Sequence, residues 1–289
     1  MFFMTLAQLQ VFVAAAKAGS FTRAAEDIGL TQSAVSQMIN SLEKELGVAL
    51  FHRSRNGITT TSIGERMLQH TREILQITAC MAEEASSARG FSSGTLRIAS
   101  IPSMASRILP GLLGAFRKKY PAVEITLFEG KNDEIHHWLS HSVVDIGITV
   151  FPEKELQTIP LIQENLMVIL PQSDPLHDQP HLSFDQIEER CFIMQKDTCY
   201  KSILLENSIH PKATIEVRDP STIVSMVQEG IGVSIMPELS VPLTTAKVRM
   251  IPLNPSITRQ MFIAVRNWQT ISPLTAEFAL HCQKYVEES

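Results

Sequence analysis

The sequence contains only four cysteines, and they are scattered at positions 80, 191, 199 and 282. No two of them form a CxxC pair, so the chain fits a reducing compartment better than a disulfide framework. The sequence also has no run of the roughly 18 apolar residues that a membrane-spanning helix requires. Its amphipathic start lacks the basic leader of a signal peptide, whether the natural start is Met1 or Met4. We therefore expect a cytoplasmic protein without a membrane partner.

Positive charge is not in excess either, because 25 Lys and Arg residues stand against 30 Asp and Glu residues, a net charge of -5. This balance argues against a protein that coats nucleic acid indiscriminately, but it leaves a local DNA site open. Hydrophobic residues make up 44% of the chain and charged residues 19%, as in ordinary folded proteins. The length of 289 residues suits about two or three domains.

Common catalytic and cofactor patterns are missing as well. The sequence has neither GxGxxG nor GxxxxGK[ST], and "GVSIM" does not complete the GxSxG elbow of hydrolases. His137 and His141 stand four apart on a predicted helix, but only Glu134 is a nearby partner, which favours a solvated face over a zinc site. We expect no enzyme activity, no cofactor and no metal.

Between Ile28 and Leu42 there is no charged side chain, although the apolar residues recur at helical spacing. The pattern predicts helices that end at Gly19 and Gly29 and a third helix capped by Thr31. The outer face of the third helix carries hydroxyl and amide side chains, which can match base edges in a major groove. We predict that this face reads DNA through Thr31, Gln32, Ser33, Ser36, Gln37 and Asn40.

The segment "FHRSRNGITTT" adds positive charge directly after these helices, and no acid occurs between Leu46 and Ile63. A turn centred on Gly57 between extended segments predicts the wing of a winged helix, with Arg53 and Arg55 placed for phosphate or the minor groove. A small helical bundle with a polar surface is the alternative for a helix-turn-helix match alone. The complete order of helices, turn, polar face and basic wing over residues 4–61 favours DNA binding.

Residues from "LAQLQVFVAAAKAG" through "FHRSRNGITTTSIG" resemble the DNA-binding region of LysR-type transcriptional regulators. In particular, "GSFTRAAEDIGLTQSAVSQMINSLEKELGVALFHR" is similar to that family's signature almost throughout. The family often has Pro where Ser33 stands and Arg where Gln37 stands, which bears on base readout rather than on binding. The resemblance implies paired linker helices, dimers that commonly form tetramers, and a two-lobed effector domain like periplasmic binding proteins. In the second half, "MVQEGIGVSIMPE" matches best.

Residues 62–89 form the predicted linker, a long helix with one glycine and no proline before its end. Ile63, Met67, Ile74 and Met81 approximate a seven-residue repeat, which predicts a dimer seam that sets the spacing of two recognition helices. We expect this helix to have little to bury against within one subunit. The alternative is a core helix of the second domain.

From Thr95 onward, apolar strands alternate with amphipathic helices, which predicts α/β lobes with a helix-covered parallel sheet. We expect residues 90–289 to form lobe I, about 94–161 and 267–289, and lobe II, about 162–266. The segments 161–171 and 259–267 would cross between the lobes.

Small ligands bind beyond the carboxyl ends of the strands in such sheets. The residues at these ends are the predicted effector contacts: Ser100, Ile101, Pro102, Ser103, Glu129, Thr149, Thr198 and Cys199. For any one of them, simple capping of the next helix is the alternative. Glu129 could repel an acid or bind an amine, so the charge of the ligand stays open. Cys199 is better explained as a pocket-lining thiol than as a redox sensor, because no second cysteine follows nearby.

The sequence thus predicts a ligand-responsive transcriptional regulator that binds double-stranded DNA at an interrupted palindrome. A small-molecule effector would shift a homodimer or homotetramer between two arrangements on DNA, with RNA polymerase as a further candidate partner. One alternative is a cytoplasmic small-molecule binding protein whose N-terminal helices serve only assembly. Another is an enzyme built on the two-lobed domain.

Overall fold

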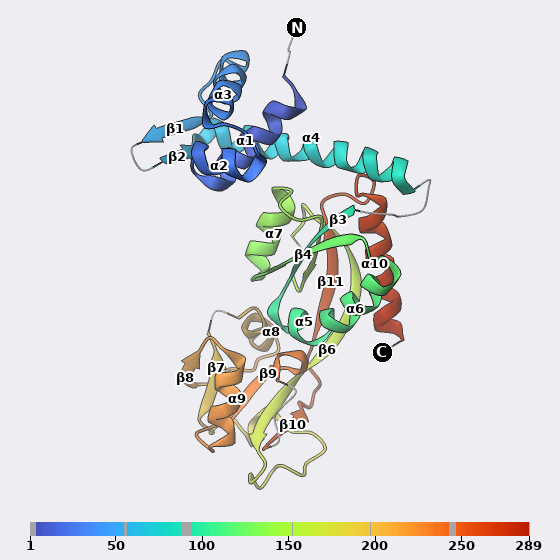
Figure 1. The fold of residues 1–289 in the computed structure, drawn as a ribbon. Coiled ribbons are helices and arrows are strands. Elements are labelled where there is room, and N and C mark those ends of the chain that lie inside the picture. The colour runs from blue at the N-terminus through green and yellow to red at the C-terminus, as the bar shows by residue number, and fades with distance from the viewer. Residues whose placement is uncertain are drawn as a thin grey trace.

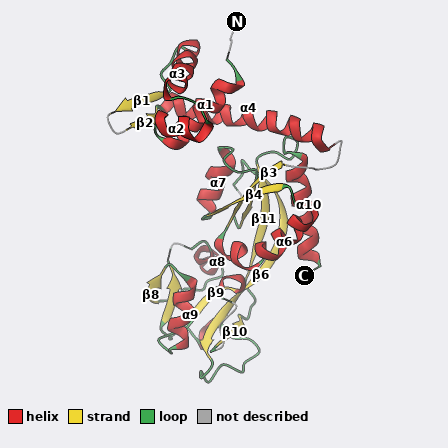
Figure 2. Cartoon of the chain, in the orientation of Figure 1, coloured by secondary structure: helices red, strands yellow, loops and turns green. Residues whose placement is uncertain are grey.

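A computed structural model shows a helical N-terminal domain, one long helix and a two-lobed α/β domain, in that order along the chain (Figure 1). The structure describes residues 4–54, 57–87, 94–151, 153–196, 198–242 and 247–288. Strands gather mainly in the two lobes, while helices build most of the N-terminal domain (Figure 2). The expected α/β class, with a winged helix-turn-helix before a two-lobed domain, is confirmed. None of the described helices is long and apolar enough to cross a membrane.

The N-terminal domain packs its helices around one core and adds a short hairpin. Its elements are α1 (Leu6–Ala18), α2 (Phe21–Ile28), α3 (Gln32–Leu46) and the antiparallel pair β1 (Phe51–Ser54) and β2 (Gly57–Thr60). Val35 and Ile39 of α3 are fully buried, as their spacing of four predicts. Gly57 has a φ of 128°, and a Cβ atom there would lie 2.5 Å from the carbonyl oxygen of Gly19. Because Ile58 N also donates to that oxygen at 3.0 Å, the hairpin is fixed against the helices.

The long helix α4 (Ser62–Ser87) has 26 residues and is about 39 Å long at 1.5 Å per residue. Leu68 is buried in the core of the N-terminal domain. Farther along, α4 lies across lobe I and contacts its C-terminal helix α10 (Pro273–Glu287) (Figure 1). The expectation that this helix has little to bury against within one subunit is therefore wrong, because two parts of the same chain pack on it.

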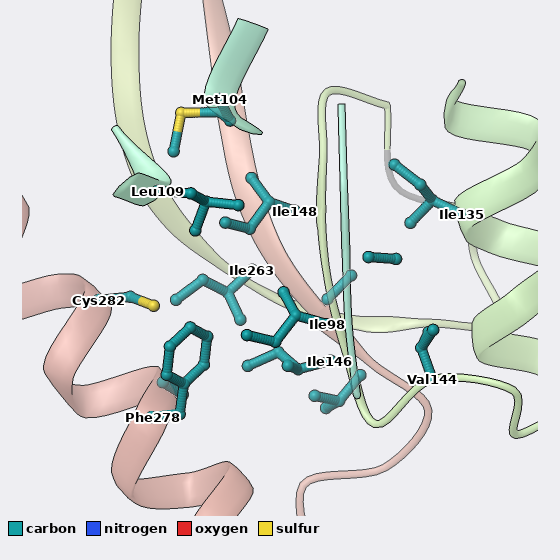
Figure 3. Packing of buried hydrophobic residues seen from close by; sticks show 14 of the residues in the cluster. Ile98, Met104, Leu109, Ile135, Val144, Ile146, Ile148, Ile263, Phe278 and Cys282 are labelled. Carbon is teal, nitrogen blue, oxygen red and sulfur yellow. The ribbon is translucent and has the colours of Figure 1, made fainter. Parts of the chain in front are cut away.

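Lobe I is built on parallel strands whose carboxyl ends lie at one edge of the sheet. The strands are β3 (Gly94–Ser100), β4 (Val123–Glu129) and β5 (Ile146–Thr149), and the helices are α5 (Pro102–Arg107), α6 (Leu109–Lys119), α7 (Asn132–Ser140) and α10. Ile98 and Ile148 of the strands pack with Ile135 of α7 and Phe278 of α10 (Figure 3). The helix α10 was not assigned from the sequence pattern.

Lobe II combines a separate parallel pair of strands with an extension of the main sheet. Its elements are η1 (Phe184–Gln186), β7 (Phe192–Gln195), α8 (Tyr200–Glu206), β8 (Ala213–Val217), α9 (Pro220–Gln228), β9 (Ser234–Pro237), η2 (Glu238–Ser240) and β10 (Val248–Pro252). The strands β9 and β10 both pair antiparallel with β6 (Gln157–Pro171). The strand β10 was not expected from the sequence.

Two antiparallel strands, β6 and β11 (Thr258–Val265), connect the lobes within a seven-stranded sheet ordered β10-β6-β11-β5-β3-β4, with β9 also paired to β6. Ile162 packs on the core of lobe I, whereas Leu166 belongs to that of lobe II. On the return, Ile257 belongs to lobe II and Met261 to lobe I. The strand β11 pairs with β5 of lobe I from Phe262 onward, within the segment 259–267 that was expected to cross between the lobes.

Candidate functional site

The outer face of α3 is polar and accessible. Thr31 caps the helix by accepting a hydrogen bond from Ala34 N at 3.2 Å, and its hydroxyl lies 3.0 Å from that of Ser33. Ser36 is half-buried, and the remaining predicted reading residues are exposed: Thr31, Gln32, Ser33, Gln37 and Asn40. The structure therefore brings all of the predicted reading residues of α3 together on one surface of the helix.

Arg53 of the hairpin is held by α3 rather than standing alone. Its Nη2 donates to Asn40 Oδ1 at 2.5 Å and to Glu43 Oε2 at 3.1 Å, and its guanidinium lies over the ring of Phe21. A guanidinium has five N–H donors, so other donors of Arg53 remain for a further partner. Arg55 lies outside the described residues.

Glu43 is a residue that the sequence argument missed. Its Oε1 accepts hydrogen bonds from the backbone N–H groups of Leu50 at 2.7 Å and Phe51 at 3.2 Å, while its Oε2 binds Arg53. One carboxylate thus connects the C-terminal half of α3 to the first strand of the wing. In the sequence, Glu43 is only an acid that precedes a basic hairpin by eight to ten residues. That spacing does not predict a contact unless the fold is known.

The predicted seam residues of α4 do not share one environment. Ile74 and Met81 are exposed, whereas Ile63 and Met67 are half-buried, and Met67 packs on the N-terminal core. Ile77, which the seven-residue repeat did not include, is 54% exposed. Ile74, Ile77 and Met81 follow one another at helical spacing; we call these three residues the apolar strip of α4.

Other side chains of α4 bind lobe I of the same chain. Arg266, just after β11, donates to Glu73 Oε1 at 2.7 Å and to Gln76 Oε1 at 2.9 Å. Gln69 Nε2 also donates to the carbonyl oxygen of Ser140 at 3.5 Å. The linker helix is therefore attached to lobe I by polar contacts as well as by packing.

A cavity of about 880 Å³ lies between the lobes. Six of the predicted effector contacts line it: Ile101, Pro102, Ser103, Glu129, Thr198 and Cys199. Ser100 and Thr149 do not, because both are fully buried. Ser100 donates to the carbonyl oxygen of Ile101, and Thr149 donates to Asn132 Oδ1 at 2.8 Å. Thr149 instead holds Asn132, which does line the cavity.

Most of the charged side chains of the cavity were not found from the sequence. They are Arg107, Lys131, Asp133, Lys196, Arg218, Asp219 and Arg259. Lys196 and Arg218 directly follow the parallel strands β7 and β8, and Lys131 lies two residues after β4. The other four lie on helices, at a helix cap or on a crossing strand, where the strand-end rule does not apply: Arg107, Asp133, Asp219 and Arg259. Arg107 Nη1 donates to the carbonyl oxygen of Val241, which connects α5 of lobe I to lobe II.

A buried ion pair lies where the crossing strands meet the cavity. Arg259 of β11 and Glu164 of β6 are direct strand partners, and their charged atoms approach to 2.7 Å. The two side chains are only 4% and 3% exposed. Arg259 Nη2 also donates to Ser103 Oγ at 2.9 Å, and Glu164 Oε2 accepts from Leu239 N at 2.7 Å. The pair therefore joins the crossing strands to α5 of lobe I and to η2 of lobe II.

The histidines considered as metal ligands stack on each other instead. The rings of His137 and His141 are 4.0 Å apart, and His141 Nδ1 contacts the carbonyl oxygen of His137 at 2.8 Å. Glu134 caps α7 by accepting from Lys131 N. In the part of the chain that the structure describes, no three His, Cys, Asp or Glu side chains are grouped to hold a metal ion.

Two family models match the sequence along almost its whole length. The model described as "Bacterial regulatory helix-turn-helix protein, lysR family" matches residues 6–65, and the one described as "LysR substrate binding domain" matches residues 89–287. The uncharacterized HTH-type transcriptional regulator YvbU of Bacillus subtilis is 32% identical and covers 98% of this chain and 97% of its own. The probable HTH-type transcriptional regulator LrrA of Synechococcus elongatus is 35% identical and covers 82% of each chain.

Solved structures share the fold at low sequence identity. Full-length OxyR from Pseudomonas aeruginosa superposes with a TM-score of 0.82 at 23% identity, covering 98% of this chain and 95% of its own. Full-length CbnR in complex with its target DNA gives a TM-score of 0.58 at 22% identity, covering 98% of this chain and all of its own.

Proposed function

Because the chain belongs to the LysR-type family of transcriptional regulators, we propose that its α3 face reads operator bases and that the cavity between its lobes binds the effector. The chain is a DNA-binding transcriptional regulator with an effector-binding domain. The proposal concerns which of its residues do this work and how they act together. Since a DNA-binding regulator acts where the DNA is, we propose that it works in the cytoplasm.

The observation that carries the DNA-binding proposal is the accessible, uncharged face of α3 beside the anchored wing. Gln32 and Gln37 offer paired donors and acceptors, which can match a base edge in two places. Arg53 lies at the flank, and its charge would attract phosphate irrespective of sequence. The uncharged face would then provide selectivity, and the wing would provide affinity.

The apolar strip of α4 supports the proposal of a homodimer. Exposed apolar side chains at helical spacing are covered efficiently by the same surface of a second copy, as in other paired helices. Two copies would carry two α3 helices to two half-sites, which suits an interrupted palindrome. Pairs of such dimers would give the homotetramer that the family resemblance implies.

A selection of genome fragments with the purified full chain tests this function. We expect one or a few fragments with an inverted repeat to be enriched, and we expect Gln32→Ala to reduce their enrichment over bulk DNA. Enrichment without any shared motif would instead favour the small-molecule binding protein whose N-terminal helices serve only assembly. The enriched fragment also supplies the operator for the experiments below.

A further inference from the structure

The charges that line the interlobe cavity are not balanced. Five cationic side chains and three acidic ones line it, and Glu164 lies behind it on Arg259. One of the acids, Asp219, already caps α9 by accepting from Thr222 N at 3.0 Å and from the Thr222 hydroxyl at 2.9 Å. The acids Glu129 and Asp133 both come from lobe I, so the surplus of cations lies on lobe II.

Three of the cations are available to a ligand. Lys131 of lobe I and Lys196 and Arg218 of lobe II are exposed, and none of them forms an ion pair with another described residue. Like charges from two lobes repel each other when the lobes approach, unless an anion lies between them. An anion that contacts both lobes therefore favours the arrangement in which these cations are close.

Arg259 provides a donor at the floor of the same cavity. Its Nε and Nη2 atoms bind Glu164 and Ser103, so the guanidinium is fixed from behind. Its Nη1 makes no hydrogen bond with a described residue, and this atom is not fully enclosed by the protein. The small accessible surface of this buried side chain therefore opens into the cavity. Because Glu164 balances its charge, Arg259 selects for a hydrogen-bond acceptor more than for net charge.

From this arrangement we propose that the effector is a small organic anion, a carboxylate or a phosphate ester. Its anionic group binds the unpaired cations Lys196 and Arg218 of lobe II together with Lys131 of lobe I. An acceptor atom of the same molecule receives a hydrogen bond from Arg259 Nη1. This inference rests on the proposed role of the cavity as the effector site.

The first test measures thermal stabilisation of the purified full chain by paired probes. Succinate is compared with succinamide, glucose 6-phosphate with glucose, and the diamine putrescine serves as the cationic probe. We expect at least one anion to raise the melting temperature more than its neutral analogue, and the two pairs distinguish a carboxylate from a phosphate ester. Equal shifts within both pairs, a larger shift with putrescine, or no shift with either anion would overturn the proposal.

The second test assigns the contacts with the better anion by titration calorimetry. Lys196→Met and Arg218→Met should each weaken its binding severalfold, and Arg259→Lys about tenfold, since a hydrogen bond to a charged group is lost. Lys212→Met is the matched control, because Lys212 is an exposed cation of lobe II that does not line the cavity. If Arg259→Lys folds poorly, the affinities of Lys196→Met and Arg218→Met test the proposal alone. Affinities of these two variants equal to that of Lys212→Met would contradict the proposal.

Parallel measurement of operator binding separates the two proposals. If a neutral compound or putrescine stabilises the chain and changes operator affinity, the cavity is an effector site but the ligand is not an anion. If an anion binds through Arg218 and leaves operator affinity and footprint unchanged, the ligand chemistry stands and the effector function fails. A change of operator affinity with the anion, lost in Arg218→Met, supports both.

Discussion

Arg266 and Glu73 join the effector-binding domain to the linker helix, with Arg266 Nη1 donating to Glu73 Oε1 at 2.7 Å. Arg266 directly follows β11, and β11 carries Arg259 at its other end. The strand is held on both sides, by β6 and by β5, so it can transmit a displacement without bending freely. One strand thus connects the floor of the cavity to the helix that positions α3.

Arg266→Met should loosen α4 from lobe I without removing either functional surface. Both partners of this ion pair are partly exposed, so we expect a loss of unfolding free energy of only about 0.5–1 kcal/mol. Hydrogen–deuterium exchange of residues 62–87 should become faster, while operator affinity without effector stays similar. Arg117→Met, at an exposed cation of α6, is the control. Equal exchange in the two variants would show that the contact does not hold the helix.

Gln32→Ala and Ser36→Ala should relax sequence preference. Each well-placed bidentate contact to a base contributes about 1–3 kcal/mol of discrimination, so the ratio of operator to mutant-operator affinity should fall for Gln32→Ala by roughly that much. Ser36 offers only one hydroxyl, so Ser36→Ala should lower this affinity ratio by less. Gln10→Ala, at an exposed position of α1, is the control. Fluorescence anisotropy with both DNAs measures the ratio, and an unchanged ratio would remove these residues from base reading.

Arg53→Ala should weaken binding to every DNA sequence. If Arg53 contacts one phosphate, the slope of log affinity against log salt should become shallower by about 0.9. Arg53 also binds Asn40 and Glu43, so the substitution removes contacts within the protein as well. Lys17→Ala, at the end of α1, serves as the control for loss of one positive charge. A slope equal to that of the control would restrict Arg53 to a role within the protein.

Ile77→Asp and Met81→Asp should disrupt the homodimer. A carboxylate in the centre of an apolar contact must lose its water without gaining a partner, which opposes association. Sedimentation velocity should show dissociation at concentrations where the unchanged chain is dimeric, and operator affinity should fall. Leu205→Asp is the matched control, since Leu205 is 48% exposed on α8 against 54% for Ile77. Unaltered sedimentation of both strip variants would place the interface elsewhere.

His137 should make stability depend on pH. Burial, and then the neighbouring His141, lower the pKa of His137 below its usual value near 6.5. The folded protein therefore binds this proton less readily than the unfolded chain does, so stability is present above about pH 6.5 and decreases as the pH falls through the folded pKa. Replacing His137 with Asn should flatten the decrease in urea unfolding measured across this range. A decrease of the same size in the variant would assign it to other groups.

The elements of the N-terminal domain could be predicted because their signals are local. Thr31 caps α3 by accepting a hydrogen bond from Ala34 N, only three residues later. The buried residues Val35 and Ile39 lie about one helical turn apart. The strand-end rule for the cavity was less reliable. It correctly selected Ser103, but it also selected Ser100 and Thr149, whose side chains point into the protein. A strand end fixes where the backbone lies, while packing decides which side chains face the cavity.

The sequence by itself determined the helix-turn-helix, its uncharged reading face and the two-lobed α/β domain, because periodicity and capping act over a few residues. Only the tertiary structure decided that Glu43 holds Arg53, that α4 binds its own effector-binding domain, and that Arg259 pairs with Glu164 across 95 residues of chain. These contacts depend on strand register and on the docking of distant elements. Many different partners are compatible with each charged residue in the sequence, and three-dimensional packing selects one of them.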